Sequence, residues 1–385
     1  MKNYKTVGTV CEYNPFHYGH SYNFNKAKKD LNADYTVCVM SGSFVQRGDV
    51  AIFDKWTRAK SAVLNGADLV VELPVFYVLQ SAKNFAYGAV KVLNSIGVDY
   101  LTFGSESGNL DYLNKVSDVV YNEPQEFKDE LKKHLDGGMG YPFAMENAIK
   151  KIIGKDFSLN PNDSLGINYL NALKDLRSDI IPYTVKRVNN YHSSDIAGGF
   201  ASATAIRNMI YENTDYTDYA PEVNEPTYSL NNIEAFILGH LRILPDGKDF
   251  SGILGMENGL DARIIDCAKK STSLKEFFEM LSCKRYTDHR LRRAVLCLIL
   301  GIESGYKMDY IRPLAFNRNG AKILKDIKES CELEIISKTA DFDLKPESML
   351  NLDIKATDIA ALCCNDSKLR YAGRDYSISP IFVDK

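Results

Sequence analysis

The chain has 385 residues, of which 45% are hydrophobic and 25% are charged, and its formal net charge is −3. This composition is typical of a soluble globular protein, and the length is sufficient for two domains. No apolar run approaches the roughly 18 residues that a membrane helix needs, and the first residues lack the apolar core of a signal peptide. We therefore expect a cytoplasmic protein with no membrane partner. Nucleic acid stays open as a partner, because a local basic patch does not require a basic chain.

The eight cysteines lie mostly within apolar runs, and no CxxC pair is present to begin a zinc site. They are predicted to be reduced core residues, and the sequence indicates no metal site built from side chains. The adjacent pair Cys363 and Cys364 follows a helical pattern, which favours two small buried residues over a redox pair.

Five short runs rich in β-branched and aromatic residues predict strands at 7–11, 35–40, 69–73, 100–103 and 181–186. The segments between them show helical periodicity, which predicts an α/β fold with a doubly wound parallel sheet, of Rossmann type, over residues 1–211. In such sheets ligands bind beyond the carboxyl ends of the strands. The loops of interest begin at Glu12, Ser41, Pro74, Gly104 and Arg187.

The acidic segment 212–226, ENTDYTDYAPEVNEP, contains two prolines and no apolar periodicity, so it is predicted to be a linker. Helical patterns dominate the residues that follow, and they predict a mainly helical C-terminal domain over 227–385. The patterns occur at 233–242, 257–270, 274–283, 291–302, 320–327 and 356–364.

The stretch VGTVCEYNPFHYGH, residues 7–20, places a His-x-Gly-His motif between a predicted strand and a predicted helix. The first turn of a helix has N–H groups without intrahelical partners and the positive end of the helix dipole, so it binds anions. His17 and His20 are three residues apart on one face, where they are expected to donate to phosphate oxygens, and Gly19 allows a close approach. A pair of helix-capping surface histidines is the alternative, but the strand and the helix are the context that phosphate binding requires.

Two further segments carry cations at predicted loops and helix starts. Gln46, Arg47 and Lys55 follow the second strand and suit an anionic or carboxylate substrate, although solvated charges are the alternative. The sequence ASATAIR, residues 201–207, offers Ser202 as a helix cap with Thr204 and Arg207 on one face. We interpret it as a clamp on the outer phosphates of a nucleoside triphosphate, against the alternative of a capped helix with a solvated arginine.

The sequence KRYTDHRLRR, residues 284–293, places five basic residues against one acid, with Tyr286 and His289 between them. Cations for backbone phosphates and rings for stacking are what single-stranded RNA loops require. A solvated helix face explains the composition equally well. The candidate RNA-binding residues are Lys284, Arg285, Arg290, Arg292 and Arg293.

Taken with their order along the chain, these motifs resemble the bacterial tRNA(Met) cytidine acetate ligases, which are relatives of the HxGH nucleotidylyltransferases. The resemblance covers essentially the whole length. It rests on EYNPFHYGH (12–20), SFVQRGDVAIFDKWTRA (43–59), FGSE (103–106), PNDSLGINYL (161–170), RVNNYH (187–192), SATAIR (202–207), KRYT (284–287) and DIKATDIAAL (353–362).

The resemblance implies an enzyme that activates acetate with ATP as acetyl-adenylate and acetylates N4 of the wobble cytidine of elongator tRNA(Met). It implies His17, His20 and Arg207 as catalytic residues, and Mg²⁺ is expected from triphosphate chemistry. The implied ATP-binding residues, beyond the two histidines, are Val10, Cys11, Glu12, Tyr13, Asn14, Pro15, Phe16, Tyr18, Gly19, Ser21, Tyr22, Asn23, Gly104, Asn162, Arg187, Ser202 and Thr204.

The chain departs from the family pattern at three places. Tyr18 stands in the variable position of the motif, Asn23 stands where a third histidine is usual, and Ser193–Ser194 stand where an acid is expected. Two other functions stay open. One is a small-molecule adenylyltransferase of coenzyme biosynthesis, which the basic C-terminal segment disfavours. The other is an RNA-binding protein with a vestigial nucleotide site, which the intact histidines disfavour.

Overall fold

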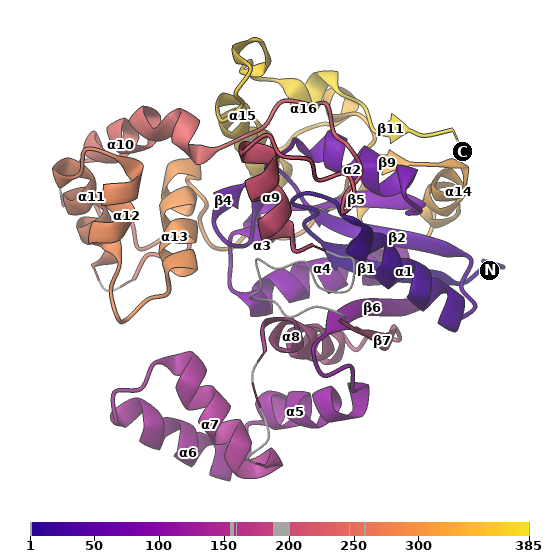
Figure 1. The fold of residues 1–385 in the computed structure, drawn as a ribbon, viewed down its shortest axis with the longest axis horizontal. Helices are drawn as coiled ribbons and strands as arrows, with labels where there is room; N and C mark the ends of the chain where they lie inside the picture. The colour runs from indigo at the N-terminus through magenta and orange to yellow at the C-terminus, as the bar shows by residue number, and fades with distance from the viewer. Residues whose placement is uncertain are drawn as a thin grey trace.

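The computed structural model describes residues 2–154, 158, 160–187, 201–245, 247–257 and 259–384 (Figure 1). Its centre is a seven-stranded sheet in the order β11-β9-β5-β2-β1-β6-β7. Five neighbouring strands are parallel: β1 (Thr6–Cys11), β2 (Tyr35–Ser41), β5 (Leu69–Leu73), β6 (Tyr100–Ser105) and β7 (Ile181–Lys186). The α/β class, the parallel sheet and all five predicted strands are confirmed, with ends that differ by at most two residues.

The middle strands are continuous apolar runs because helices cover both faces of the sheet. All five residues of β5 are buried, and the core includes Val37, Leu69 and Leu93. The crossover helices are α1 (Tyr18–Asp30), α2 (Lys55–Leu64), α4 (Ala82–Ile96) and α8 (Pro161–Asp175). Between β2 and α2 lies a hairpin of β3 (Phe44–Val45) and β4 (Asp49–Val50), and the short helix α3 (Val75–Val78) follows β5.

Two strands of the main sheet come from the C-terminal part of the chain. β9 (Pro313–Phe316) pairs antiparallel with β5, and β11 (Ile381–Phe382) pairs with β9. Neither strand was predicted, because runs of two to four residues carry too little periodicity to distinguish from loops. The sheet therefore contains residues from both sides of the predicted domain boundary, which itself remains a prediction.

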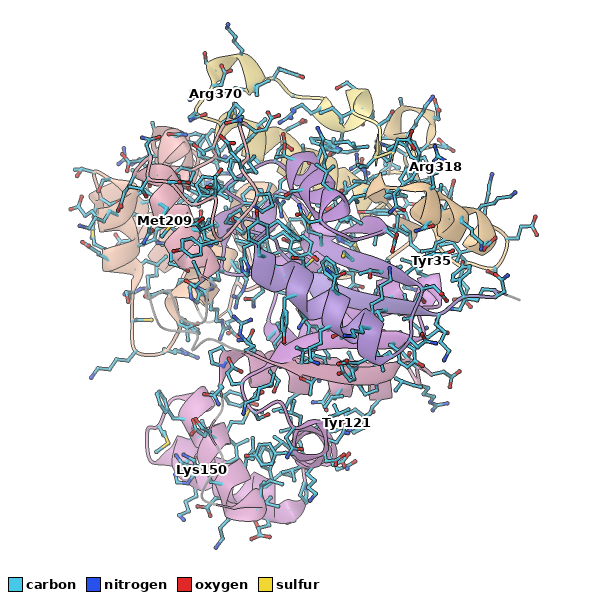
Figure 2. All side chains as sticks on the ribbon, turned by 45° about the vertical axis from the view of Figure 1, so that its right-hand side comes forward. Tyr35, Tyr121, Lys150, Met209, Arg318 and Arg370 are labelled. Carbon is cyan, nitrogen blue, oxygen red and sulfur yellow. The ribbon has the colours of Figure 1, made fainter. Side chains whose placement is uncertain are left out.

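Three helices project from the body between β6 and α8. They are α5 (Leu110–Asn122), α6 (Gln125–Asp136) and α7 (Tyr141–Ile153). Figure 2 labels Tyr121 and Lys150 on this projection, away from the sheet. Apolar residues such as Leu113, Val116 and Ala148 join the projection to the core.

The C-terminal region is mainly helical, as predicted. The helix α9 (Ala203–Tyr211) precedes the acidic segment. The helices and short strands after the acidic segment, besides β9 and β11, are η1 (Leu230–Ile233), α10 (Glu234–Arg242), α11 (Leu260–Lys270), α12 (Leu274–Leu281), α13 (Asp288–Leu300), β8 (Tyr310–Ile311), α14 (Arg318–Ile327), β10 (Glu334–Ile335), η2 (Thr339–Asp341), α15 (Leu350–Leu362), η3 (Ser367–Leu369) and α16 (Arg374–Ser377). The predicted helices are all found with shifted ends; the one predicted at 356–364 begins six residues earlier, at Leu350.

The acidic segment 212–226 packs against α9 and the start of α1. Ala220 is buried with Ala205 and Ile206 of α9, and the carbonyl of Tyr219 accepts the N–H of Tyr18 at 2.9 Å. One of the free N–H groups at the start of α1 is therefore already paired. Within the ranges given above, no helix combines the length and the apolar character needed to cross a membrane.

Candidate functional site

The His-x-Gly-His motif lies at the carboxyl end of β1, where the chain turns into α1. Tyr13 has a positive φ of 45°, and the Asn14–Pro15 peptide bond is cis. The side-chain oxygen of Asn14 accepts the N–H of Ile52 at 2.8 Å, which holds the turn against the neighbouring loop. His17 is the N-cap of α1, and His20 lies in its first turn. The predicted strand-turn-helix is confirmed.

The two imidazoles form one unit. Their rings stack with centroids 3.6 Å apart, and Nδ1 of His20 accepts the backbone N–H of His17 at 3.1 Å. An accepting Nδ1 means that neutral His20 carries its proton on Nε2, which is therefore a hydrogen-bond donor. Nδ1 of His17 is buried and has no hydrogen-bond partner among the described residues. A buried polar atom of this kind calls for a ligand.

Both histidines are neutral at physiological pH. Burial, followed by the positive charge of Arg187, lowers the pKa of His17 to about 3. Burial, then His17 and Arg187, lowers the pKa of His20 well below its usual value. The pair therefore contributes N–H donors, whereas the positive charge at the site comes from neighbouring arginines.

Arg207 reaches the motif from α9. Ser202 caps this helix by accepting the N–H of Ala205 at 3.1 Å, as predicted. The guanidinium of Arg207 donates to Thr204 Oγ1 at 3.0 Å and to the carbonyl of Asn14 at 2.6 Å. The structure thus brings the SATAIR segment to the His-x-Gly-His turn, although about 180 residues separate them in the sequence.

The ends of β6 and β7 form the opposite side of the site. A β-carbon on Gly104 would lie 3.3 Å from Cγ of Arg187, so the arginine stem lies directly over this glycine. Asn162, at the start of α8, donates its side-chain N–H to Glu106 at 2.6 Å. Glu106 also accepts the backbone N–H groups of Asn162 and Asp163, at 3.2 and 2.9 Å. Glu106, the last residue of the FGSE motif, is a site residue that the sequence did not predict.

Glu12 is a buried carboxyl group among arginines. Its Oε1 accepts the backbone N–H of Gln46 at 2.6 Å. Burial raises the pKa of Glu12, and the charges of Arg58, Arg47 and Arg207 counteract this rise. Arg58, which the sequence analysis did not single out, is buried and donates to the carbonyls of Glu12, Ser41, Gly42 and Phe53. Arg58 therefore joins the loop after β1, the end of β2 and the turn before α2.

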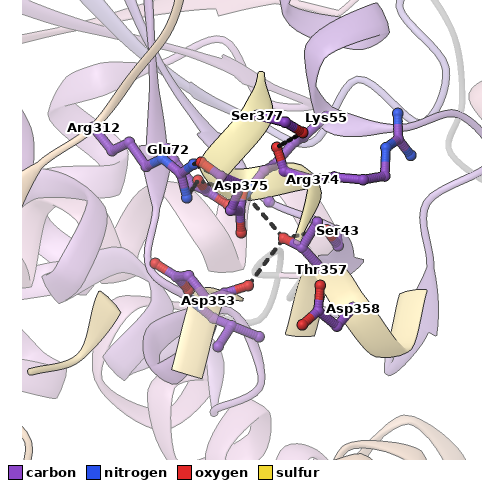
Figure 3. A network of polar contacts seen from close by, with 12 residues as sticks. Ser43, Lys55, Glu72, Arg312, Asp353, Thr357, Asp358, Arg374, Asp375 and Ser377 are labelled. Carbon is purple, nitrogen blue, oxygen red and sulfur yellow. Dashed lines mark hydrogen bonds and ion pairs between the residues drawn. The ribbon is translucent and has the colours of Figure 1, made fainter. Parts of the chain in front are cut away.

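The structure corrects the predicted role of Lys55. Its side chain is fully buried, and its ammonium group pairs with Glu72 at 2.8 Å and Asp375 at 2.9 Å and donates to Thr357. Arg312 completes this network, which Figure 3 shows among elements from both ends of the chain. An amine with three internal partners is not available to a substrate. Gln46 keeps its place near Glu12, but its side-chain amide donates to the carbonyl of Gln80 at 3.3 Å.

The basic segment divides into exposed and internally paired side chains. Lys284 and Arg285 are exposed, and the Arg285 guanidinium lies 5.3 Å from the ring centre of Tyr286. The guanidinium of Arg290 lies 4.4 Å from the centre of the same Tyr286 ring and pairs with Glu257. Arg292 covers Phe278, and Arg293 donates to the carbonyl of Gln46. Four of the five predicted RNA contacts, all but Lys284, therefore have a partner within the described part of the chain, and Arg285 is the exposed one among these four.

The remaining residues of the first loop differ in exposure. Phe16 is buried beside Tyr13, whereas Tyr18 and Tyr22 are exposed. Asn23 is half-buried, with its oxygen 3.4 Å from the hydroxyl of Thr102. Val10 and Ser21 are half-buried, and the thiol of Cys11 donates to Val39. Ser193 and Ser194 lie outside the described residues.

The chain is similar to known proteins over nearly its whole length. The model of the HIGH nucleotidyl transferase family matches residues 4–375. The tRNA(Met) cytidine acetate ligase of Acetivibrio thermocellus is 36% identical over 98% of this chain and 100% of its own length. The protein of the same name from Caldanaerobacter subterraneus subsp. tengcongensis is 40% identical over 93% of this chain and 95% of its own length.

A solved structure extends the likeness to the fold. Thermotoga maritima TmcAL, crystallised with alpha-thio ATP, is 33% identical and aligns with a TM-score of 0.86 over 99% of this chain and 100% of its own. Its apo form aligns with a TM-score of 0.89. With a family match over nearly the whole length and relatives well above 30% identity, the chain belongs to the HIGH nucleotidyltransferase family, in the group of the tRNA(Met) cytidine acetate ligases.

Proposed function

We propose that this protein is a cytoplasmic ATP-dependent ligase that acetylates N4 of the wobble cytidine of elongator tRNA(Met). Acetate is first activated as acetyl-adenylate with release of pyrophosphate, and acetyl transfer to the tRNA then releases AMP. The names of the curated relatives support the substrates, and the alpha-thio ATP in the Thermotoga maritima structure supports the nucleotide. The observation that carries the proposal is the unpartnered, buried Nδ1 of His17 at the start of α1.

The adenylation step uses donors that are already in place. When an acetate oxygen attacks the α-phosphorus, negative charge grows on the phosphate oxygens, and the bond to pyrophosphate breaks. His17 and His20 are neutral N–H donors at the helix N-terminus, and donors fixed before the reaction stabilise such charge strongly. Arg187 and Arg207 supply the positive charge on either side of the histidines. The outer phosphates are expected at Ser202, Thr204 and Arg207.

The transfer step needs an unstacked cytidine at the same place. Its exocyclic amine is delocalised into the ring and is a poor nucleophile, so it requires an acyl group that carries a good leaving group. The nitrogen attacks the acetyl carbon, the bond to AMP breaks, and the nitrogen loses one proton. Single-stranded RNA is bound through its phosphates and through stacking of its bases, which Lys284, Arg285 and Tyr286 offer on the basic segment.

Mg²⁺ remains an expectation from triphosphate chemistry. In the ranges that the structure describes, no group of three or more His, Cys, Asp or Glu side chains is placed to hold a metal ion. Mg²⁺ commonly takes most of its ligands from water and substrate phosphates.

The proposal is tested by incubating the protein with ATP, labelled acetate and total tRNA, followed by nucleoside analysis. We expect labelled N4-acetylcytidine together with AMP and pyrophosphate. Adenylation of a small molecule without acetate would indicate a coenzyme-biosynthesis adenylyltransferase instead. Binding of tRNA without consumption of ATP would indicate an RNA-binding protein with a vestigial site.

A further inference from the structure

The hairpin formed by β3 and β4 connects the His-x-Gly-His turn with the basic helix α13. Figure 1 shows β4 between α13 and α9. At the tip of the hairpin, the backbone N–H of Gln46 donates to Glu12 at 2.6 Å. The backbone carbonyl of the same residue accepts from Nη1 of Arg293 at 2.9 Å. One residue is thus held on one side by the loop of the candidate site and on the other side by α13.

The packing of Gly48 supports this connection independently. This residue has a φ of +76°, and a β-carbon on it would lie 2.6 Å from Cβ of Arg292 and 2.7 Å from the backbone nitrogen of Arg293. The tip of the hairpin therefore rests directly on the backbone of α13. Only glycine combines this backbone conformation with this approach.

Charged side chains of α13 and α9 also lie near the hairpin residue Asp49. Burial raises the pKa of Asp49, and the positive charges of Arg292 on α13 and Arg207 on α9 counteract this rise. His289 of α13 makes a hydrogen bond with the backbone of Arg47. The guanidinium of Arg293 is half-buried at this junction, whereas Lys284 and Arg285 are exposed at the free end of the basic segment.

We propose that Arg293 is a positioning residue for acetyl transfer, which holds α13, and with it the RNA bound at Lys284 and Arg285 just before this helix, in register with the His-x-Gly-His turn through Gln46 and Glu12. This inference rests on the proposed function and deepens it. Transfer requires the cytidine amine within about 3–3.5 Å of the acyl carbon, and a misplacement of about 1 Å costs roughly a hundredfold in rate. In this proposal Arg293 acts through the carbonyl of Gln46, in contrast to the RNA contact that the sequence predicts.

The test separates the two half-reactions in Arg293→Met and Gly48→Ala. Acetate-dependent exchange between pyrophosphate and ATP without tRNA measures adenylation, and acetylation at saturating tRNA measures transfer. In both variants the rate of transfer is expected to fall about tenfold relative to the rate of exchange, while the Kd for tRNA changes less than about twofold. Arg293→Lys keeps a donor toward the Gln46 carbonyl and is expected to restore part of the transfer rate.

Lys284→Met is the contrasting variant. An exposed phosphate contact, when removed, weakens tRNA binding and lowers the slope of log K against log salt by about one. If Arg293→Met behaves in this way, it contacts RNA and the inference is wrong. If it lowers exchange and transfer equally, Arg293 only supports the fold of the site, and the inference is also wrong. Absence of acetate-dependent exchange in the unaltered protein is a separate result, which would contradict the proposed function itself.

Discussion

Two polar clusters lie at the carboxyl edge of the same sheet, and they differ in whether their polar side-chain atoms already have partners within the described part of the chain. Around His17 and His20, a buried ring nitrogen lacks a partner and the arginines face a turn at a helix N-terminus. Around Lys55, the ammonium group is enclosed by Glu72, Asp375 and Thr357. The first cluster is suited to a charged ligand. In the second cluster the cations and carboxylates pair with one another, and these pairs connect C-terminal residues with the N-terminal sheet.

The largest expected effect on stability is that of Lys55→Met. Removal of one partner from a buried ion pair leaves the other charge uncompensated, which costs about 3–5 kcal/mol. We expect a loss of this order in the free energy of unfolding, measured in urea, with adenylation by the folded protein reduced only a few-fold. A large rise in the KM for acetate at unchanged stability would instead restore the role that the sequence analysis gave to Lys55.

His20→Ala is expected to show the opposite behaviour. Loss of one transition-state donor lowers kcat by about a hundredfold to a thousandfold. The stability should change less than in Lys55→Met, because His20 is neutral and the partners of its ring are His17 and the aromatic residues of the same motif. Acetate-dependent exchange between pyrophosphate and ATP measures the effect, and an unchanged rate would remove His20 from the proposed mechanism.

The low pKa of His17 predicts a dependence of stability on pH. In the folded protein the His17 imidazole is protonated only when the pH falls to about 3, whereas in the unfolded chain it is protonated near pH 6.5. Between these values the unfolded state binds more protons, so stability falls as pH falls, with a slope of up to about 1.4 kcal/mol per pH unit. His17→Asn should reduce this slope, measured by urea unfolding from pH 6.5 downward, while the contribution of His20, whose pKa is also lowered, remains. An equal slope in both proteins would contradict the burial of His17.

The smallest expected effect concerns Glu106, which accepts three N–H groups at the start of α8. Glu106→Gln removes the charge that complements this helix end and loosens Asn162, a loss of about 1 kcal/mol. If Asn162 binds the nucleotide, the KM for ATP should rise about fivefold with little change in kcat. Asn162→Ala provides the comparison, because it removes the proposed contact itself. Glu106→Gln with an unchanged KM would separate Glu106 from nucleotide binding.

The motif of the first loop was predictable because its context is local. The strand, the turn with Gly19 and the start of the helix all lie within about twenty residues of the sequence. The relative position of the two histidines follows from helical spacing. The same holds for Ser202, whose capping hydrogen bond spans only three residues. The hydrogen bond of Arg207 with the carbonyl of Asn14, which joins distant segments, was not predicted.

What the sequence by itself determined is the α/β class, the five parallel strands and the helix N-terminus that presents His17 and His20, since these depend on periodicity and on neighbours along the chain. Only the tertiary structure decided which cations have partners. Lys55 and Arg293 resemble solvated site residues in the sequence, yet Glu72 and Asp375 pair with the first and the Gln46 carbonyl with the second. The physical reason is that the protonation and availability of a charged side chain depend on burial and on through-space partners, which sequence spacing does not encode.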